Sequence, residues 1–203
     1  VDTVVDYIRS TAENELLTRG GLREEEDIFA SVWSSVRNRW SWLAVNLITA
    51  FIASRVIGAF EGSIEKLVAL AALMPIVASI GGNTGNQTVA LVIRGIALSQ
   101  LNPGNTLFLL RKELAIGVMN GAMWGIVMAF ATLLLYHSAG LAAVMASAMM
   151  LNMLVASVAG VACPLVLKRM GRDPVMGSSI LLTAITDSMG FLIFLALASA
   201  LLL

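Results

Sequence analysis

The chain has 203 residues, of which 58% are hydrophobic and 13% charged, and its mean hydropathy is +0.86. This composition excludes an ordinary soluble domain and indicates a membrane protein. The 13 basic and 13 acidic residues give a formal net charge of zero, so the sequence predicts no binding of nucleic acid or of another polyanion.

Residues 1–39 carry most of the acidic side chains and are expected to form a cytoplasmic connecting helix and linker. The chain begins with Val1 rather than Met and has no signal-peptide pattern at this end. We therefore expect it to be cut from a longer protein. The membrane domain is predicted over residues 40–203.

Five transmembrane helices are predicted in this domain. The first covers about 21 residues from Trp40, which matches a hydrocarbon core of about 30 Å, and Trp40 and Trp42 suit the membrane interface. Gly117, Gly121 and Gly125 follow each other at four-residue spacing and predict close helix packing, and Asn120 and Asn152 are each expected to hydrogen bond between helices. The predicted spans are 40–60, 67–98, 114–136, 141–167 and 175–203.

The second apolar stretch is interrupted by Pro75 and by the polar segment Gly81-Gly82-Asn83-Thr84-Gly85-Asn86-Gln87. We expect the helix to break at this segment. A break at membrane depth is tolerated where it is buried in protein or lines a watery cavity, so the amides and carbonyls are predicted to line a pore. The alternative is a kink that only packs against a neighbouring helix.

Basic residues predict the orientation in the membrane. They precede the first span, follow the second and fill the connection between the fourth and fifth, whereas the opposite connections carry only Lys66 and His137. The positive-inside rule therefore predicts a multi-pass protein of the cell's inner membrane, with a cytoplasmic N-terminus and with Leu203 outside. The residues are Arg37, Arg39, Arg94, Arg111, Lys112, Lys168, Arg169 and Arg172.

Asp187 is a carboxylate well inside a predicted span, 13 residues after Pro174 and so about 20 Å along a helix. A charge at this depth costs about 2.5 to 3.5 kcal/mol, which a cation or a hydrogen-bond partner must offset. The nearby oxygens of Thr183, Thr186 and Ser188 suit Mg²⁺, Ca²⁺ or Mn²⁺. Two copies of the chain around a two-fold axis would present two carboxylates to one ion. Alternatively, Asp187 is protonated or amide-bonded and only joins two helices.

These residues resemble the membrane domain of the MgtE family of magnesium channels. The resemblance extends over residues 40–203. It rests on Pro75 with the segment at 81–87, on Gly171-Arg172-Asp173-Pro174, and on the run from Ser178-Ser179 to Thr183 and Asp187.

The resemblance implies a homodimer whose pore lies on the two-fold axis and is lined mainly by the second and fifth spans. Asp187 would hold hydrated Mg²⁺ between two copies, with the Thr183 backbone carbonyl as a further contact. Residues 81–87, Ser179 and Thr186 would line the pore, although Ser179 stands where some relatives carry Asn. Two further implications are cytoplasmic sensor domains ahead of this chain, and contacts to a regulatory Mg²⁺ from Glu15 and Asp173.

Three functions stay open at this stage. Channel-like conduction of Mg²⁺ is favoured because of the intramembrane carboxylate and the broken second span. An inside-negative potential would supply about 4.6 kcal/mol per 100 mV for a doubly charged ion. The alternatives are an ion-coupled divalent cation carrier and a non-conducting membrane anchor or sensor. An enzyme is not predicted, because the sequence has no Walker-type glycine loop, no paired zinc-binding histidines and no nucleophile elbow.

Overall fold

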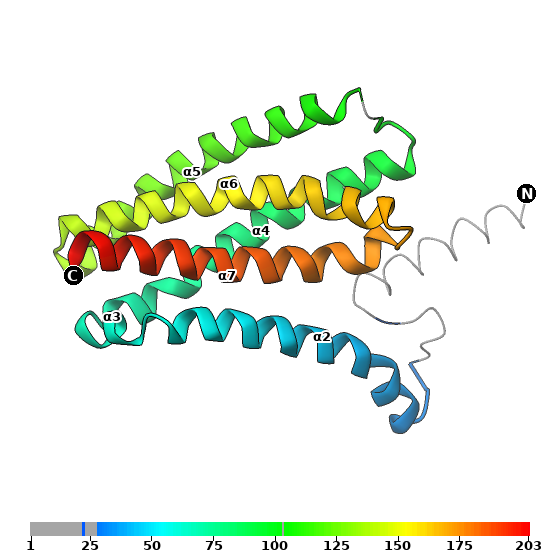
Figure 1. The fold of residues 1–203 in the computed structure, drawn as a ribbon, viewed down its shortest axis with the longest axis horizontal. Coiled ribbons are helices and arrows are strands. Elements are labelled where there is room, and N and C mark those ends of the chain that lie inside the picture. Colours follow the sequence, from blue (N-terminus) through cyan, green and yellow to red (C-terminus); the bar gives the residue numbers. More distant parts are fainter. Residues whose placement is uncertain (1–21, 23–27, 103) are drawn as a thin grey trace, which may run out of the picture.

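The computed structural model describes residues 22, 28–102 and 104–203, and the regular structure in this part is entirely helical. Figure 1 shows the five long helices running along one axis in alternating directions, with the short helix α3 at the end where α2 leads into α4. The predicted all-α class is confirmed. The helices are α2 (Val32–Gly58), α3 (Glu61–Lys66), α4 (Ala69–Ala97), α5 (Thr106–Tyr136), α6 (Ala139–Arg169) and α7 (Pro174–Leu202).

Four of the described helices, α2, α5, α6 and α7, are long and apolar enough to cross a membrane. Helix α4 has 29 residues and is as long as α7, but the polar segment at 81–87 lowers its hydropathy. Helix α2 begins at Val32, eight residues before the predicted start of the first span. The connecting helix predicted within residues 1–39 lies mostly outside the described residues.

The predicted break in the second span is wrong. Helix α4 runs without interruption from Ala69 to Ala97 and contains both Pro75 and the whole segment 81–87. Glycine costs about 1 kcal/mol in a helix relative to alanine, but a buried contact that only glycine permits can offset this cost. Gly81 and Gly85 are such positions, because a Cβ at Gly81 would overlap Asn152 and one at Gly85 would overlap Leu182.

Helix α6 lies at the centre of the bundle and packs against α4, α5 and α7. Its Asn152 is fully buried, and the side-chain Nδ2 donates a hydrogen bond to the Val77 carbonyl of α4 at 2.8 Å. A Cβ at Gly190 of α7 would lie 2.9 Å from this Nδ2. The amide therefore fits only because Gly81 and Gly190 both lack a side chain. The interhelical hydrogen bond expected of Asn152 is confirmed, whereas within the described part of the chain the Asn120 side chain makes no hydrogen bond.

Helices α5 and α6 meet along the three glycines that the sequence singled out. A Cβ at Gly117 would contact Ser157, one at Gly121 would contact Met150, and one at Gly125 would lie 3.1 Å from the Ala146 carbonyl oxygen. All three glycines are buried. The close packing predicted from their four-residue spacing is confirmed.

Replacing Gly81 with alanine is expected to destabilise the protein by about 1–3 kcal/mol, because the added methyl group overlaps the Asn152 amide. Thermal unfolding of the detergent-solubilised chain measures the change. Gly62→Ala on α3 is the matched control, since nothing lies within 4 Å of its Cβ position. Equal melting temperatures for the two variants would contradict this packing.

Candidate functional site

Polar side chains form a stripe on the neighbouring helices α4 and α7. On α4 two members lie three and four residues after the first, and on α7 the members are spaced by four, so each set occupies one helix face. The α4 members are exposed and the α7 members are half-buried. We call this set the polar stripe. It consists of Asn83, Asn86 and Gln87 of α4 with Ser179, Thr183 and Asp187 of α7.

Close contacts between α4 and α7 join the two halves of the polar stripe. The Ser179 hydroxyl donates a hydrogen bond to Asn86 Oδ1 at 3.3 Å. Further along, a Cβ at Gly82 would lie 3.6 Å from the Thr186 hydroxyl oxygen, so the two backbones are close. The structure thus brings the polar segment of the second span beside the polar face of the fifth.

Asp187 lies near the midpoint of the 29-residue helix α7, 13 residues after Pro174. Within the described part of the chain, no hydrogen bond or ion pair involves its carboxylate. The neighbouring Thr186 hydroxyl is directed to its own helix, where it donates to the Leu182 and Thr183 carbonyls at 3.0 and 3.3 Å. Asp187 is therefore a half-buried carboxylate for which the described residues provide no ion-pair or hydrogen-bond partner.

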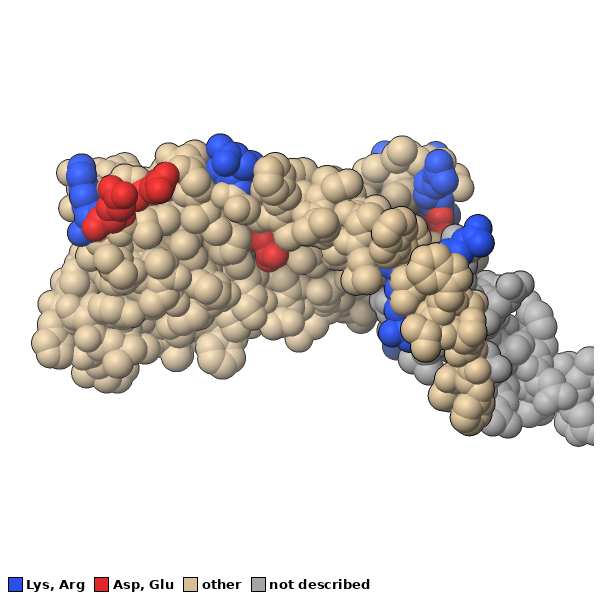
Figure 2. All heavy atoms as spheres, turned by 90° about the horizontal axis from the view of Figure 1, so that it is seen from below, with Lys and Arg blue, Asp and Glu red and all other residues tan. Residues whose placement is uncertain are grey.

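Figure 2 shows charged side chains toward both ends of this face, one red acidic patch near the middle of its length, and a blue basic patch that lies close to this red patch in the view. The basic residues used to predict orientation lie at the start of α2 and α5 and at the ends of α4 and α6. Those ends share one side of the bundle in Figure 1. The basic residues that predict the orientation therefore lie toward one end of the bundle, whereas Asp187 lies near the middle of α7.

The two residues expected to contact regulatory Mg²⁺ do not join the polar stripe. Asp173 caps the start of α7, where its Oδ1 accepts a hydrogen bond from the Val175 N–H at 2.9 Å. It lies 14 residues before Asp187, or about 21 Å along the helix, so the two carboxylates belong to different sites. Glu15 lies outside the described residues. Among the described residues, no group of three or more Asp, Glu, His or Cys side chains could hold a metal.

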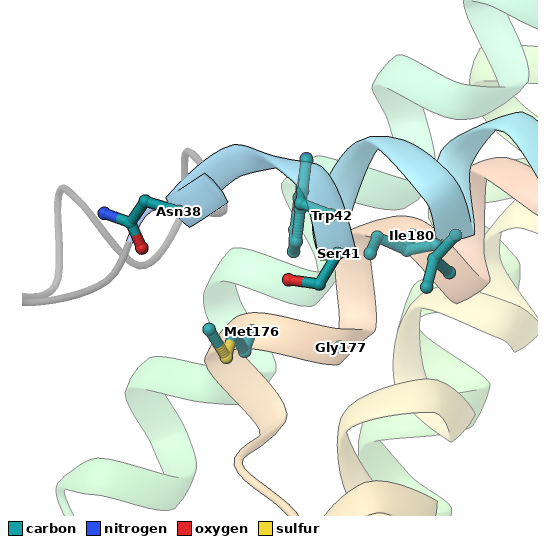
Figure 3. Close-up of a pocket in the computed structure, with 7 residues that line it drawn as sticks. Asn38, Ser41, Trp42, Met176, Gly177 and Ile180 are labelled. Atoms are coloured by element: carbon teal, nitrogen blue, oxygen red, sulfur yellow. The ribbon is translucent and has the colours of Figure 1, made fainter. Parts of the chain in front are cut away.

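A hollow of about 250 Å³ lies between residues 38–45 of α2 and the first two turns of α7 (Figure 3). In this view Ser41 points from α2 toward the start of α7. The lining contains no carboxylate, so it offers no charged ligand to a cation. Its residues are Asn38, Ser41, Trp42, Val45, Met176, Gly177 and Ile180.

Sequence reasoning missed Glu113, a second carboxylate inside a long helix. It is 3% exposed on α5, and one carboxylate oxygen accepts a hydrogen bond from the Thr88 hydroxyl of α4 at 2.8 Å. The other oxygen has no hydrogen-bond partner in the described part of the chain. The third span was expected to begin at residue 114, but α5 begins at Thr106. The sequence did indicate this position, because Glu113 lies four residues before Gly117 and therefore on the same helix face as the three glycines.

Fold and site together define a multi-pass helical membrane domain with a polar, oxygen-rich stripe between two of its long helices. Residues 74–197, more than half of the chain, match the family described as MgtE, divalent cation transporter. The chain belongs to this family.

Three curated relatives are named magnesium transporter MgtE. The chain is 28% identical to the Thermus thermophilus protein over 207 residues, 27% to that of Bacillus subtilis over 200, and 25% to that of Enterococcus faecalis over 199. These alignments cover 98–100% of this chain but only 44–45% of each relative. The chain thus spans less than half the length of the relatives it matches.

Thr88→Val is expected to destabilise the protein by about 1–3 kcal/mol, because it leaves the buried Glu113 carboxylate without its donor. The matched control is Thr84→Val, because the Thr84 hydroxyl is half-buried and donates only to the Ile80 carbonyl of its own helix. Both substitutions conserve shape, so thermal unfolding in detergent isolates the lost hydroxyl. A larger loss in the Thr84 variant would contradict a structural role for the Glu113 contact.

Proposed function

We propose that this chain is the membrane part of a magnesium transporter and conducts hydrated Mg²⁺ through a pore formed by two copies. The observation that carries the proposal is the Asp187 carboxylate at the middle of α7, within the polar stripe, for which the described residues provide no ion-pair partner. Membership of a divalent cation transporter family and the names of the relatives support Mg²⁺ as the ion.

Energetics favour a two-copy site. A lipid-facing charge near the bilayer centre costs about 2.5 to 3.5 kcal/mol, and the exposed amides of Asn83, Asn86 and Gln87 would also lose hydrogen bonds to water there. A second copy related by a two-fold axis covers both polar stripes and turns them toward one aqueous path. Asp187 of each copy then faces the same ion.

The polar stripe suits a hydrated ion better than a bare one. Mg²⁺ dehydrates reluctantly and usually keeps several waters, so carboxylate, amide and carbonyl oxygens can bind it through those waters. In this proposal the two Asp187 carboxylates supply the charge. The Thr183 carbonyl and the exposed amides of Asn83, Asn86 and Gln87 supply polar contacts, whereas Gly81, Gly85 and Thr186 of the predicted lining are buried inside the bundle. Asn86 and Ser179, which hydrogen bond to each other, form the end of the path nearer the start of α7.

The proposed function includes an orientation in the membrane and a regulatory Mg²⁺ site. The start of α7 is cytoplasmic by the positive-inside rule, as is the N-terminus, and the chain sits in the inner membrane with Leu203 outside. Asp173 lies at this cytoplasmic end, exposed and separate from Asp187, where it can meet a regulatory Mg²⁺ together with Glu15. Cytoplasmic sensor domains that precede this chain in the longer protein would present that ion.

Asp187→Asn is expected to reduce Mg²⁺ influx at least tenfold, since it removes both negative charges from the ion path while leaving the side chain nearly the same size. The measurement is influx into proteoliposomes that contain a fluorescent Mg²⁺ indicator, driven by Mg²⁺ alone with no Na⁺ or H⁺ gradient. Glu65→Gln on α3 is the control, because this exposed carboxylate lies outside the polar stripe and its loss should leave influx unchanged.

When influx is compared at equal protein content, its dependence on ion gradients and on Asp187 distinguishes a channel from a coupled carrier and from a membrane anchor. Influx that needs a Na⁺ or H⁺ gradient would identify a coupled carrier. Absence of influx under every gradient, from a folded protein, would favour a membrane anchor or sensor. Unchanged influx in Asp187→Asn would remove Asp187 from the mechanism.

A further inference from the structure

Two surface grooves follow the line where α5 meets α6, and they differ in charge. One, of about 490 Å³, surrounds the contacts of Gly121 and Gly125 and has no charged residue in its lining. The other, of about 420 Å³, lies between the start of α5 and the end of α6 and includes Arg169. We call the second the basic groove. It is lined by Thr106, Leu107, Leu110, Val158, Val161, Ala162, Leu165, Val166 and Arg169.

The basic groove exists because α5 leaves α6 toward its own start (Figure 1). The glycine contacts hold the two helices together from Gly125 back to Gly117. Beyond Gly117 the same face of α5 carries Glu113, whose carboxylate turns to Thr88 of α4 rather than to α6. The close glycine contacts to α6 therefore end at Gly117, and the basic groove lies beyond them.

Length and lining of the basic groove match one leaflet of a bilayer. Val158 and Arg169 are 11 residues apart on α6, or about 16 Å, and half of a hydrocarbon core of about 30 Å is about 15 Å. Val161, 3% exposed, forms the floor, and Leu107 and Val166 stand at the rim with 55% and 47% exposure. An extended acyl chain fits this shape, with its headgroup beside Arg169.

Arg169 supplies the charge complementarity. It is exposed in the last turn of α6 beside Lys168, and no ion pair to it is found among the described residues. Basic pockets between transmembrane helices recognise anionic headgroups. We propose that the basic groove binds an anionic phospholipid, with one acyl chain between α5 and α6 and the phosphate on Arg169. Because neither helix contributes to the polar stripe, this lipid site is separate from the proposed ion path.

The test is native mass spectrometry of the full chain in detergent with equal amounts of dioleoyl phosphatidylglycerol and dioleoyl phosphatidylcholine. The chain is expected to retain phosphatidylglycerol about fivefold over phosphatidylcholine, which is roughly the contribution of one near-surface basic residue. Arg169→Gln should bring the ratio to about one, and Arg169→Lys should restore most of the preference. Arg172→Gln, in the loop outside the groove, should leave the ratio unchanged.

A second pair of variants tests the acyl-chain contact. Ala162→Trp fills the basic groove and should lower phosphatidylglycerol retention severalfold, whereas Ala122→Trp fills the uncharged groove and should not. Both positions lie on the α5–α6 surface, and a monodisperse size-exclusion peak shows that each variant is folded. Equal retention of both lipids by the unmodified chain, or a preference that survives Arg169→Gln, would overturn the proposal.

Discussion

The close approach of α4 and α7 to the Asn152 amide of α6 determines where the polar residues of this protein lie. The amide donates to the Val77 carbonyl and occupies space that side chains at Gly81 and Gly190 would fill. With both helices seated on α6, Gly82 meets Thr186 and Asn86 meets Ser179. The register of the polar stripe is thus a consequence of packing on its buried side.

This arrangement leaves a membrane domain with polar groups on its outside. The exposed amides of α4 and the half-buried Asp187 lie on helices whose other faces form the core of the bundle. In a bilayer such a surface is unfavourable unless protein or water covers it. The proposed second copy removes this cost and, by two-fold symmetry, doubles the negative charge available to a divalent ion.

Much of the fold could be predicted because it depends on local patterns. Continuous apolar runs indicated the stretches that became α5, α6 and α7, and four-residue glycine spacing indicated the α5–α6 contact. The helical rise alone placed Asp187 near mid-helix. The continuity of α4 could not be predicted in this way. Gly81 stays helical because Asn152, 71 residues further along the chain, packs against it.

In the candidate site, too, residue types could be predicted from local sequence but contacts between distant residues could not. The polar residues were predicted, but their pairing was not, because Asn86 and Ser179 are 93 residues apart. Glu113 was missed because hydropathy marks where a helix enters the apolar region, while α5 begins eight residues earlier at Thr106. Residue types therefore identified what the site contains, and tertiary packing decides which of these residues meet.

Cysteine cross-linking in native membranes would show whether two copies of the chain face each other through their polar stripes. In a Cys163→Ala background, which removes the buried native thiol, Asn83→Cys should give a linked dimer with a bifunctional maleimide. Phe130→Cys, 63% exposed on α5, should not. A dimer from Phe130→Cys but none from Asn83→Cys would show that the copies meet through another surface.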